Sequence, residues 1–193
     1  MLPLFPSDRR CRPRTLDNPL RRRFAPATRE LDLLSLASGQ TVADLGAGVG
    51  FFGPEILRRV GPRGRLYLVD PDAGNLARAA ARVGPDPRVH ILQASAARVE
   101  EIPDGSVDCV LLSLVLCCMV DKEGALNEAW RIIRPSGRCY ASYPRRSLVP
   151  RFRRPSLRVT PERWEALARL HPWRAIRTPP SWVVTRHLLE RPA

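Results

Sequence analysis

The chain has 193 residues, 44% of them hydrophobic. This length and composition fit one folded domain with an adequate core and argue against a chain that is disordered as a whole. The longest apolar stretch, 109–120, is well short of the ~20 residues that a membrane-spanning helix needs, so no membrane insertion is expected. The formal net charge is +13, but Lys122 is the only lysine among 32 basic residues, and this arginine bias of the whole chain weakens the case for a nucleic-acid site.

The first part of the chain predicts a loosely ordered basic arm. Residues 1–14 contain Pro3, Pro6 and Pro13 and show no apolar periodicity. The opening apolar segment is brief and its charges follow it, so we expect no signal peptide and a cytoplasmic location. We predict an arm over 1–27 and a single domain over 28–193. In that domain, Thr28 would cap a helix that runs to Leu36.

A glycine-rich run follows the first predicted strand, 41–45, and is the most informative segment. Asp44 stands near the end of that strand, and three glycines then occupy alternate positions: Gly46, Gly48 and Gly50. Such glycines let the backbone turn sharply into a helix N-terminus, which attracts polar ligand groups. The dinucleotide fingerprint requires glycine where the chain has Phe51, which argues against NAD and FAD. The Asp44 carboxylate would repel a pyrophosphate but suits a sulfonium or ammonium group, so the pattern favours S-adenosylmethionine.

The next elements alternate between helix and strand. An apolar face from Phe52 to Val60 predicts a helix that ends at Gly61. Strand 66–69 is then closed by Asp70, a carboxylate that can accept both hydroxyls of a ribose. Asp72 caps a further helix that ends at Gly84, and the third strand covers 89–92.

The second half of the domain continues this alternation. We predict a fourth strand over 109–113, a helix with its apolar face from Leu126 to Ile133, a turn at 135–137 and a fifth strand over 138–143. Strands and helices at this spacing imply a parallel sheet with helices on both sides. In the tail, we expect Thr160 to start a helix that carries Trp164. Two antiparallel strands are expected to follow, over 173–177 and 182–188.

Four segments together resemble the motifs of a known enzyme family. VADLGAGVG, LYLVDP, IPDGSVDCVLLSLVL and AWRIIRPSGR are similar, in order and spacing, to motif I, motif II, the fourth-strand motif and the motif before the fifth strand of class I S-adenosylmethionine-dependent methyltransferases. The similarity spans roughly 18–143 and is strongest to the UbiE-like, type 11 group. It implies an α/β, Rossmann-like three-layer sandwich with a mostly parallel seven-stranded sheet in the order 3-2-1-4-5-7-6.

The resemblance also implies which residues bind the cofactor. Ligands of open α/β sheets bind outside the carboxyl ends of the strands. The glycines would pack against the methionine and ribose, Asp44 would face the amino or sulfonium group, Asp70 would hold the ribose and Pro71 would flank the adenine. Ser95, followed by Ala96, stands where relatives carry an acid for the adenine amino group. The complete predicted set is Asp44, Gly46, Gly48, Gly50, Asp70, Pro71, Ser95, Ala96 and Ser113.

No catalytic base is assigned, because methyl transfer from a sulfonium mainly requires positioning in a water-poor pocket. His90 lies within the third strand, where a core or sheet histidine is the simpler interpretation. His171 and His187 lie in the tail, and the sequence does not decide whether they reach a substrate. Cys117 occupies the position after the fourth strand where many relatives carry histidine.

The cysteines predict reduced thiols and no metal site. Their number is odd, and no C-x-x-C spacing occurs among Cys11, Cys109, Cys117, Cys118 and Cys139. The adjacent pair, Cys117 and Cys118, could bind a soft metalloid such as arsenic. Against this, adjacent residues on a strand or helix point to different faces.

The acceptor class is left open between a small molecule and a macromolecule. The fourth-strand motif lacks the N/D-P-P-Y/F turn of enzymes that methylate exocyclic amines of nucleobases, which favours a small-molecule acceptor. Arginines crowd 9–23 and 145–158, and these flanks could bind RNA or an acidic protein. The small-molecule hypothesis makes the arm and segment 144–159 a lid. A non-catalytic cofactor-binding protein on the same fold is the remaining alternative.

Overall fold

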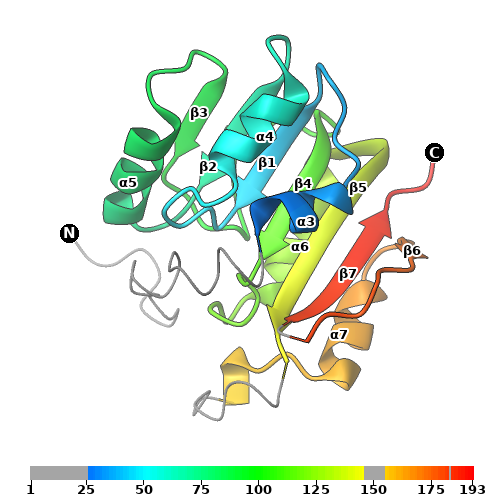
Figure 1. Ribbon diagram of the computed structural model, residues 1–193. Coiled ribbons are helices and arrows are strands. Elements are labelled where there is room, and N and C mark those ends of the chain that lie inside the picture. The colour runs from blue at the N-terminus through cyan, green and yellow to red at the C-terminus, as the bar shows by residue number, and fades with distance from the viewer. Residues whose placement is uncertain (1–25, 146–154, 183) are drawn as a thin grey trace.

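The computed structural model describes residues 26–145, 155–182 and 184–193. In these ranges seven strands form one sheet in the order β3-β2-β1-β4-β5-β7-β6 (Figure 1). The pairs β1–β2, β2–β3, β1–β4 and β4–β5 are parallel, whereas β7 is antiparallel to β5 and to β6. The predicted strand order is therefore confirmed, with a mixed sheet in which the tail supplies the antiparallel strands.

The elements have the following bounds. The strands are β1 Thr41–Leu45, β2 Arg65–Val69, β3 Val89–Leu92, β4 Val107–Ser113, β5 Ile133–Pro144, β6 Arg174–Ile176 and β7 Val184–Glu190. The helices are α3 Ala27–Asp32, α4 Gly53–Val60, α5 Ala73–Val83, α6 Lys122–Ile132 and α7 Pro161–Ala168, with a 3-10 turn, η2, at Pro155–Leu157.

Two apolar layers flank the sheet. One layer packs α3, α4 and α5 against it through residues such as Leu31, Ile56 and Ala79. The other packs α6 and α7 through Leu126 and Trp164. Parallel strands covered on both faces consist of nearly continuous apolar residues, as in β4. The three-layer sandwich is confirmed.

The predicted local signals explain most helix ends. The Asp72 carboxylate accepts the Asn75 N–H at 3.1 Å, and the Thr160 hydroxyl accepts the Arg163 N–H at 3.2 Å, so both residues cap helices as expected. Gly61 and Gly84 follow α4 and α5 with φ of 66° and 73°, and glycine adopts such positive φ values without steric cost because it has no Cβ.

Several predicted boundaries are wrong. β4 begins at Val107 rather than at 109, and β7 spans Val184–Glu190 rather than 182–188. Thr28 does not cap α3, because extended Pro26 occupies the capping position and the helix ends at Asp32. β5 begins at Ile133 rather than at 138, since the 135–137 turn is paired with the end of the chain: the Ser136 N–H donates to the Arg191 carbonyl at 2.8 Å. Backbone pairing with a distant segment leaves no local signal in the sequence.

A buried polar cluster holds α3 against the sheet. The Glu30 carboxylate of α3 accepts hydrogen bonds from the Arg186 guanidinium of β7 and the Tyr140 hydroxyl of β5. The side chains of Glu30 and Arg186 are 5% and 6% exposed. A buried charge requires a partner because its desolvation is costly, so this cluster fixes the position of α3.

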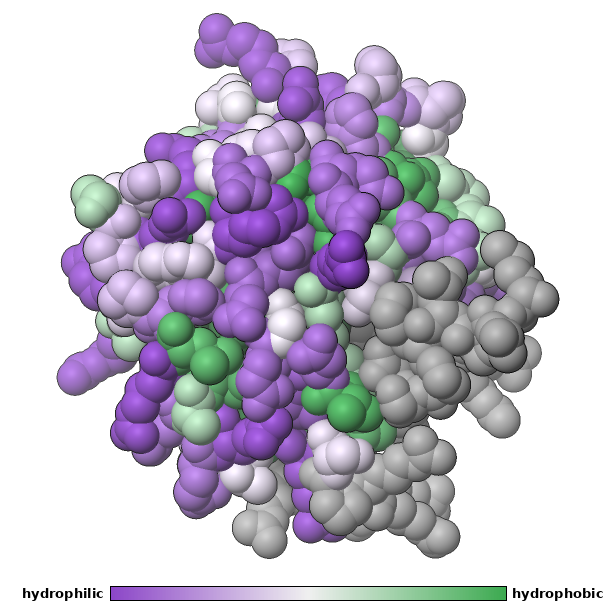
Figure 2. All heavy atoms as spheres, turned by 180° about the vertical axis from the view of Figure 1, so that it is seen from behind, coloured by the Kyte–Doolittle hydropathy of each residue, from purple (hydrophilic) through white to green (hydrophobic). Residues whose placement is uncertain are grey.

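The described residues on the face opposite to that of Figure 1 are predominantly polar. Figure 2 shows hydrophilic residues over most of one face, with small, separate apolar patches. Many described arginines are paired with carboxylates, among them Arg59, Arg88 and Arg131, which fits a solvated charged surface. Within the described ranges, no helix has both the length and the apolar character to cross a bilayer. Residues 1–25 of the predicted arm lie outside those ranges.

Candidate functional site

The glycine turn joins the carboxyl ends of β1 and β2. The N–H groups of Gly46 and Ala47 both donate to the Val69 carbonyl, at 2.7 and 2.8 Å. Gly46, Gly48 and Gly50 have φ of 82°, 55° and 71°. A side chain in this conformation is strained. The turn therefore needs glycine at all three positions, as its spacing predicts.

Asp70 lies beside this turn. One carboxylate oxygen, Oδ2, accepts the Gly48 N–H at 2.9 Å, and Oδ1 accepts the Asp72 N–H at 2.9 Å and the Asn75 side-chain amide at 3.3 Å. Asp70 is 7% exposed, and this burial raises the pKa of its carboxyl above the usual value, against the opposing effect of the three donors. A carboxylate offers about four acceptor positions, so Asp70 retains capacity for a ligand hydroxyl.

The turn also packs closely against two other elements. A Cβ at Gly46 would lie 2.4 Å from Cγ2 of Val115, in the segment after β4. A Cβ at Gly50 would lie 2.9 Å from both Cα and Cβ of Ala79 in α5. The turn thus contacts α5 on one side and the β4–α6 connection on the other.

The remaining predicted cofactor residues are placed as follows. Asp44 is 2% exposed in β1, opposite Leu68 and Leu111 of the neighbouring strands. Pro71 is exposed, and its carbonyl accepts from the Gln93 amide at 3.4 Å, next to the end of β3.

Three residues of the set are engaged away from the turn. The Ser95 hydroxyl accepts the Ala97 N–H at 3.2 Å. The Ala96 side chain is part of the core on the α6 side. The Ser113 hydroxyl lies 3.4 Å from that of Ser142 in β5. The structure therefore brings Asp70 together with the glycines and Pro71, but the side chains of these three residues serve local packing and pairing.

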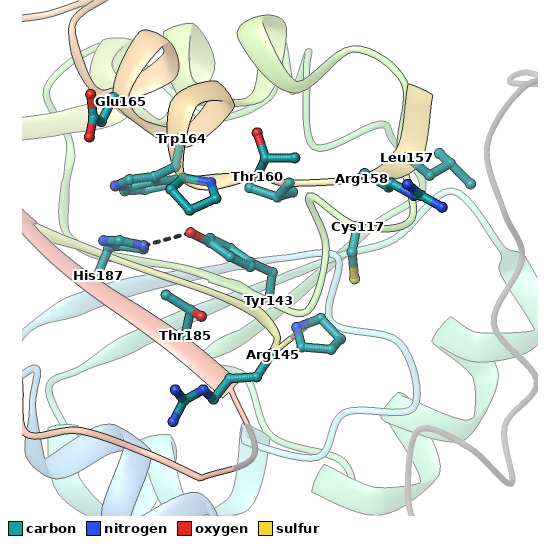
Figure 3. A pocket seen from close by; sticks show the side chains of 13 residues that line it. Cys117, Tyr143, Arg145, Leu157, Arg158, Thr160, Trp164, Glu165, Thr185 and His187 are labelled. Carbon is teal, nitrogen blue, oxygen red and sulfur yellow. Dashed lines mark hydrogen bonds between the residues drawn. The ribbon is translucent and has the colours of Figure 1, made fainter. Parts of the chain in front are cut away.

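A cavity of about 670 Å³ opens near the ends of β4 and β5 (Figure 3). Its wall includes Cys117 of the β4–α6 connection, two residues beyond the Val115 side chain that meets the glycine turn. The predicted lid segment 144–159 is described at 144–145 and 155–159, and both parts supply lining residues. The buried Lys122 ammonium holds the second part by donating to the Ser156 carbonyl at 2.6 Å. The wall of the cavity also includes Tyr143, Arg145, Arg158, Trp164 and His187.

His187 is the histidine that reaches the cavity. Its Nε2 lies 3.0 Å from the Tyr143 hydroxyl, and its ring stacks on Trp164 with a centroid separation of 3.8 Å (Figure 3). Burial lowers the pKa of His187 to about 4 and raises that of Tyr143 to about 12. Both groups are therefore neutral near pH 7.

The other two described histidines lie elsewhere. His171 stacks on Trp130 at 4.7 Å and lies 2.9 Å from the Asn127 side chain. His90 is an exposed residue of the edge strand β3 and stacks on Tyr67 at 5.0 Å. His90 is thus a sheet histidine, as expected.

The depressed pKa of His187 predicts a pH dependence of stability. The unfolded chain binds this proton near pH 6.5, whereas the folded protein binds it only near pH 4. The stabilising contribution is thus complete above pH 6.5 and is lost as the pH falls toward 4. We expect the free energy of unfolding, from denaturant titrations at several pH values, to fall over this interval and to fall less steeply in His187→Gln. An equal slope in the variant would contradict this assignment.

Sequence reasoning missed several residues of the site. Asn75 orients Asp70 from the first turn of α5, and its proximity to the Asp72 cap was the only available signal. Val115 had no local signal, because its contact is with Gly46 in a distant segment. The contact between Tyr143 and His187 had none either, because β5 and β7 pair only in the folded protein.

Comparison with known proteins agrees with the motifs. Residues 43–141, about half of the chain, match the family described as methyltransferase domain, Methyltransf_11. The ubiquinone/menaquinone biosynthesis C-methyltransferase UbiE of Enterobacter sp. (strain 638) is 33% identical over 111 residues, which cover 56% of this chain and 44% of the relative. The chain thus matches less than half the length of that relative.

Solved structures share the fold. A SAM-dependent methyltransferase from Aquifex aeolicus aligns over 94% of this chain and 99% of its own, with a TM-score of 0.80 and 19% identity. The N-methyltransferase NodS from Bradyrhizobium japonicum WM9 aligns over 92% and 99%, with a TM-score of 0.69 and 15% identity. At these identities the comparison establishes the architecture alone.

The residues at the glycine turn fit S-adenosylmethionine. The Asp70 carboxylate is buried, held by three donors and beside a turn whose three positive-φ glycines carry no side chain over the strand ends. A ribose hydroxyl can donate to such a carboxylate. The match over residues 43–141 shows that the chain belongs to the methyltransferase domain family, the type 11 group of class I S-adenosylmethionine-dependent methyltransferases, and the geometry of the turn agrees with it.

Proposed function

We propose that this chain transfers the methyl group of S-adenosylmethionine to a small-molecule acceptor held in the 670 Å³ cavity. The observation that carries the proposal is the continuity of the two sites: Val115 packs under Gly46 of the cofactor turn, and Cys117, two residues on, lines the cavity. A cofactor on the turn would therefore be adjacent to an acceptor in the cavity.

The cofactor-binding roles of individual residues are part of this proposal. Asp70 would accept the ribose hydroxyls, and the Gly46–Gly50 turn would pack against the methionine and ribose portions. Asp44 would face the amino or sulfonium group and Pro71 the adenine. With their hydroxyls engaged locally, Ser95 and Ser113 would contribute mainly through shape, and Ala96 through its backbone. S-adenosylmethionine supplies an electrophilic methyl group on a positively charged sulfur.

The cavity residues would position the acceptor. Trp164 and the neutral His187 ring offer flat surfaces for a planar molecule, and the Tyr143 hydroxyl offers a hydrogen bond. Arg145 and Arg158, both exposed, place positive charge at the same cavity and would attract an anionic group. Positioning in a water-poor pocket is the main requirement of this chemistry, so no residue is assigned as a base.

Removal of the Asp70 carboxylate should weaken cofactor binding. We expect micromolar-range affinity for S-adenosylmethionine and S-adenosylhomocysteine by calorimetry, and a loss of at least about tenfold in Asp70→Ala, from one charged hydrogen-bonding group. Asp121→Ala is the matched control, because Asp121 also caps a helix, α6, but is exposed and outside the site. Equal affinity in Asp70→Ala and the parent would refute the assigned role.

Activity assays with candidate acceptors test the acceptor class. The relative from Enterobacter is named a C-methyltransferase, which makes carbon acceptors the first class to test. RNA or an acidic protein is the alternative, based on the arginine flanks, of which 9–23 and 146–154 lie outside the described residues. Steep salt dependence of RNA binding would favour that alternative, and cofactor binding without turnover of any acceptor would favour a non-catalytic protein. A cytoplasmic location stays a prediction.

A further inference from the structure

Cys117 and Cys118 place two thiols side by side. Their Sγ atoms are 3.9 Å apart, and they lie 3.2 and 3.5 Å from the same acceptor, the Leu114 carbonyl. The expectation that adjacent side chains point to different faces is wrong here, because the two residues lie in a turn rather than on a helix or strand. Leu114 has a φ of 60°, and the Cys118 N–H donates to the Val115 carbonyl at 2.7 Å.

We propose that Cys117 and Cys118 form a dithiol site that binds trivalent arsenic. Arsenous acid would condense with both thiols: two As–S bonds form, two As–O bonds break, and each departing hydroxide leaves as water with a thiol proton. Arsenic stays trivalent, so no oxidant or reductant is needed. It keeps one hydroxyl, and the site requires only two protein ligands.

The sulfur separation suits two bonds to one atom. Two sulfurs bound at about 2.3 Å, the length of a zinc–thiolate bond, lie about 3.8 Å apart at a tetrahedral angle. The observed 3.9 Å is close to this separation. The S–As–S angle at a three-coordinate arsenic is narrower than tetrahedral and would shorten the Sγ–Sγ separation by about half an ångström. Side chains in a turn can make a shift of this size.

Two other uses of the pair fit less well. A structural zinc ion takes four ligands, yet the described residues contain no group of three or more His, Cys, Asp or Glu side chains placed to hold a metal. A disulfide between them is hindered, because adjacent Cα atoms are about 3.8 Å apart whereas disulfides usually span about 4.4–6.8 Å. The geometry favours a dithiol that stays reduced.

The pair lies at the cavity, although Cys117 itself is only 4% exposed, whereas the sheet cysteines do not line it. Cys117 lines the cavity (Figure 3), and Cys118 is partly exposed. Cys109 and Cys139 are buried in β4 and β5, and burial raises the pKa of each thiol to about 12. A thiol reagent should therefore distinguish the pair from the sheet cysteines.

Phenylarsine oxide, which releases one water when it joins two thiols, tests the site by intact-mass measurement. Cys11 lies outside the described residues, so the parent for this test carries Cys11→Ser. We expect one adduct per chain that survives excess 2-mercaptoethanol and is removed by 1,2-ethanedithiol. Cys117→Ser and Cys118→Ser should each weaken binding at least about a hundredfold, since the second bond is no longer intramolecular. The control Cys139→Ala should bind as the parent does.

Several outcomes would overturn the proposal. These are no adduct on the parent, an adduct unaffected by either serine variant, or an adduct lost in Cys139→Ala while that variant stays folded by circular dichroism. The site does not rest on the proposed function. Calorimetry with S-adenosylhomocysteine on the same samples reports the cofactor site separately, so failure of one assignment is distinguishable from failure of the other.

Discussion

Glu30→Ala is expected to lower the free energy of unfolding by about 3–5 kcal/mol, the cost of leaving a buried charge without its partner. Arg186, 6% exposed at its side chain, would lose the carboxylate that it contacts through two nitrogens, and the Tyr140 hydroxyl would lose its acceptor. Chemical denaturation followed by circular dichroism measures this loss.

Two further variants distinguish the cost of leaving Arg186 without a partner from the cost of lost side-chain packing. Glu100→Ala removes an exposed partner of Arg98, where both side chains are more than two-thirds exposed, and should cost at most about 1 kcal/mol. The double variant Glu30→Leu, Arg186→Met removes both buried charges and should be more stable than Glu30→Ala. If Glu30→Ala costs no more than Glu100→Ala, the buried cluster does not hold α3 in place.

Gly50→Ala is the second substitution with a large expected effect. Its φ of 71° would cost a side chain about 1–2 kcal/mol. The added Cβ would also lie 2.9 Å from the Cα and Cβ of Ala79, and such overpacking costs about 1–3 kcal/mol more. The turn and α5 would have to move apart, so we also expect affinity for S-adenosylhomocysteine to fall at least tenfold.

Gly84→Ala is the matched control for this substitution. Gly84 has nearly the same φ, 73°, but a Cβ there would meet nothing within 4 Å. It should therefore show the conformational cost alone and leave cofactor affinity unchanged. Denaturation and calorimetry on both variants test the difference. Equal effects in the two would mean that the contact between the turn and α5 is unimportant.

The sequence predicts those features of the molecule that depend on local rules. The Asp72 cap, the glycines of the turn and the acids at the ends of β1 and β2 were all placed correctly, because periodicity, capping and left-handed φ are properties of short segments. The strand order followed from the four motifs and their resemblance to one family.

Features that depend on distant residues were not predictable. The Glu30 cluster joins residues 110 and 156 positions apart, and the cavity forms only where β5, β7 and α7 meet. The early start of β5 depends on pairing with Arg191. Cys117 and Cys118 approach each other in a turn that follows Leu114, whose positive φ of 60° is one that leucine rarely adopts and that no pattern predicts.

The location of S-adenosylhomocysteine in a crystal of the complex is the most direct measurement of the central claim. We expect its sugar hydroxyls within hydrogen-bond distance of the Asp70 carboxylate, its amino acid portion along the Gly46–Gly50 turn, and its sulfur toward the cavity lined by Cys117 and Tyr143. A nucleoside bound elsewhere, or a turn that stays empty at saturating ligand, would contradict both the cofactor site and the proposed reaction.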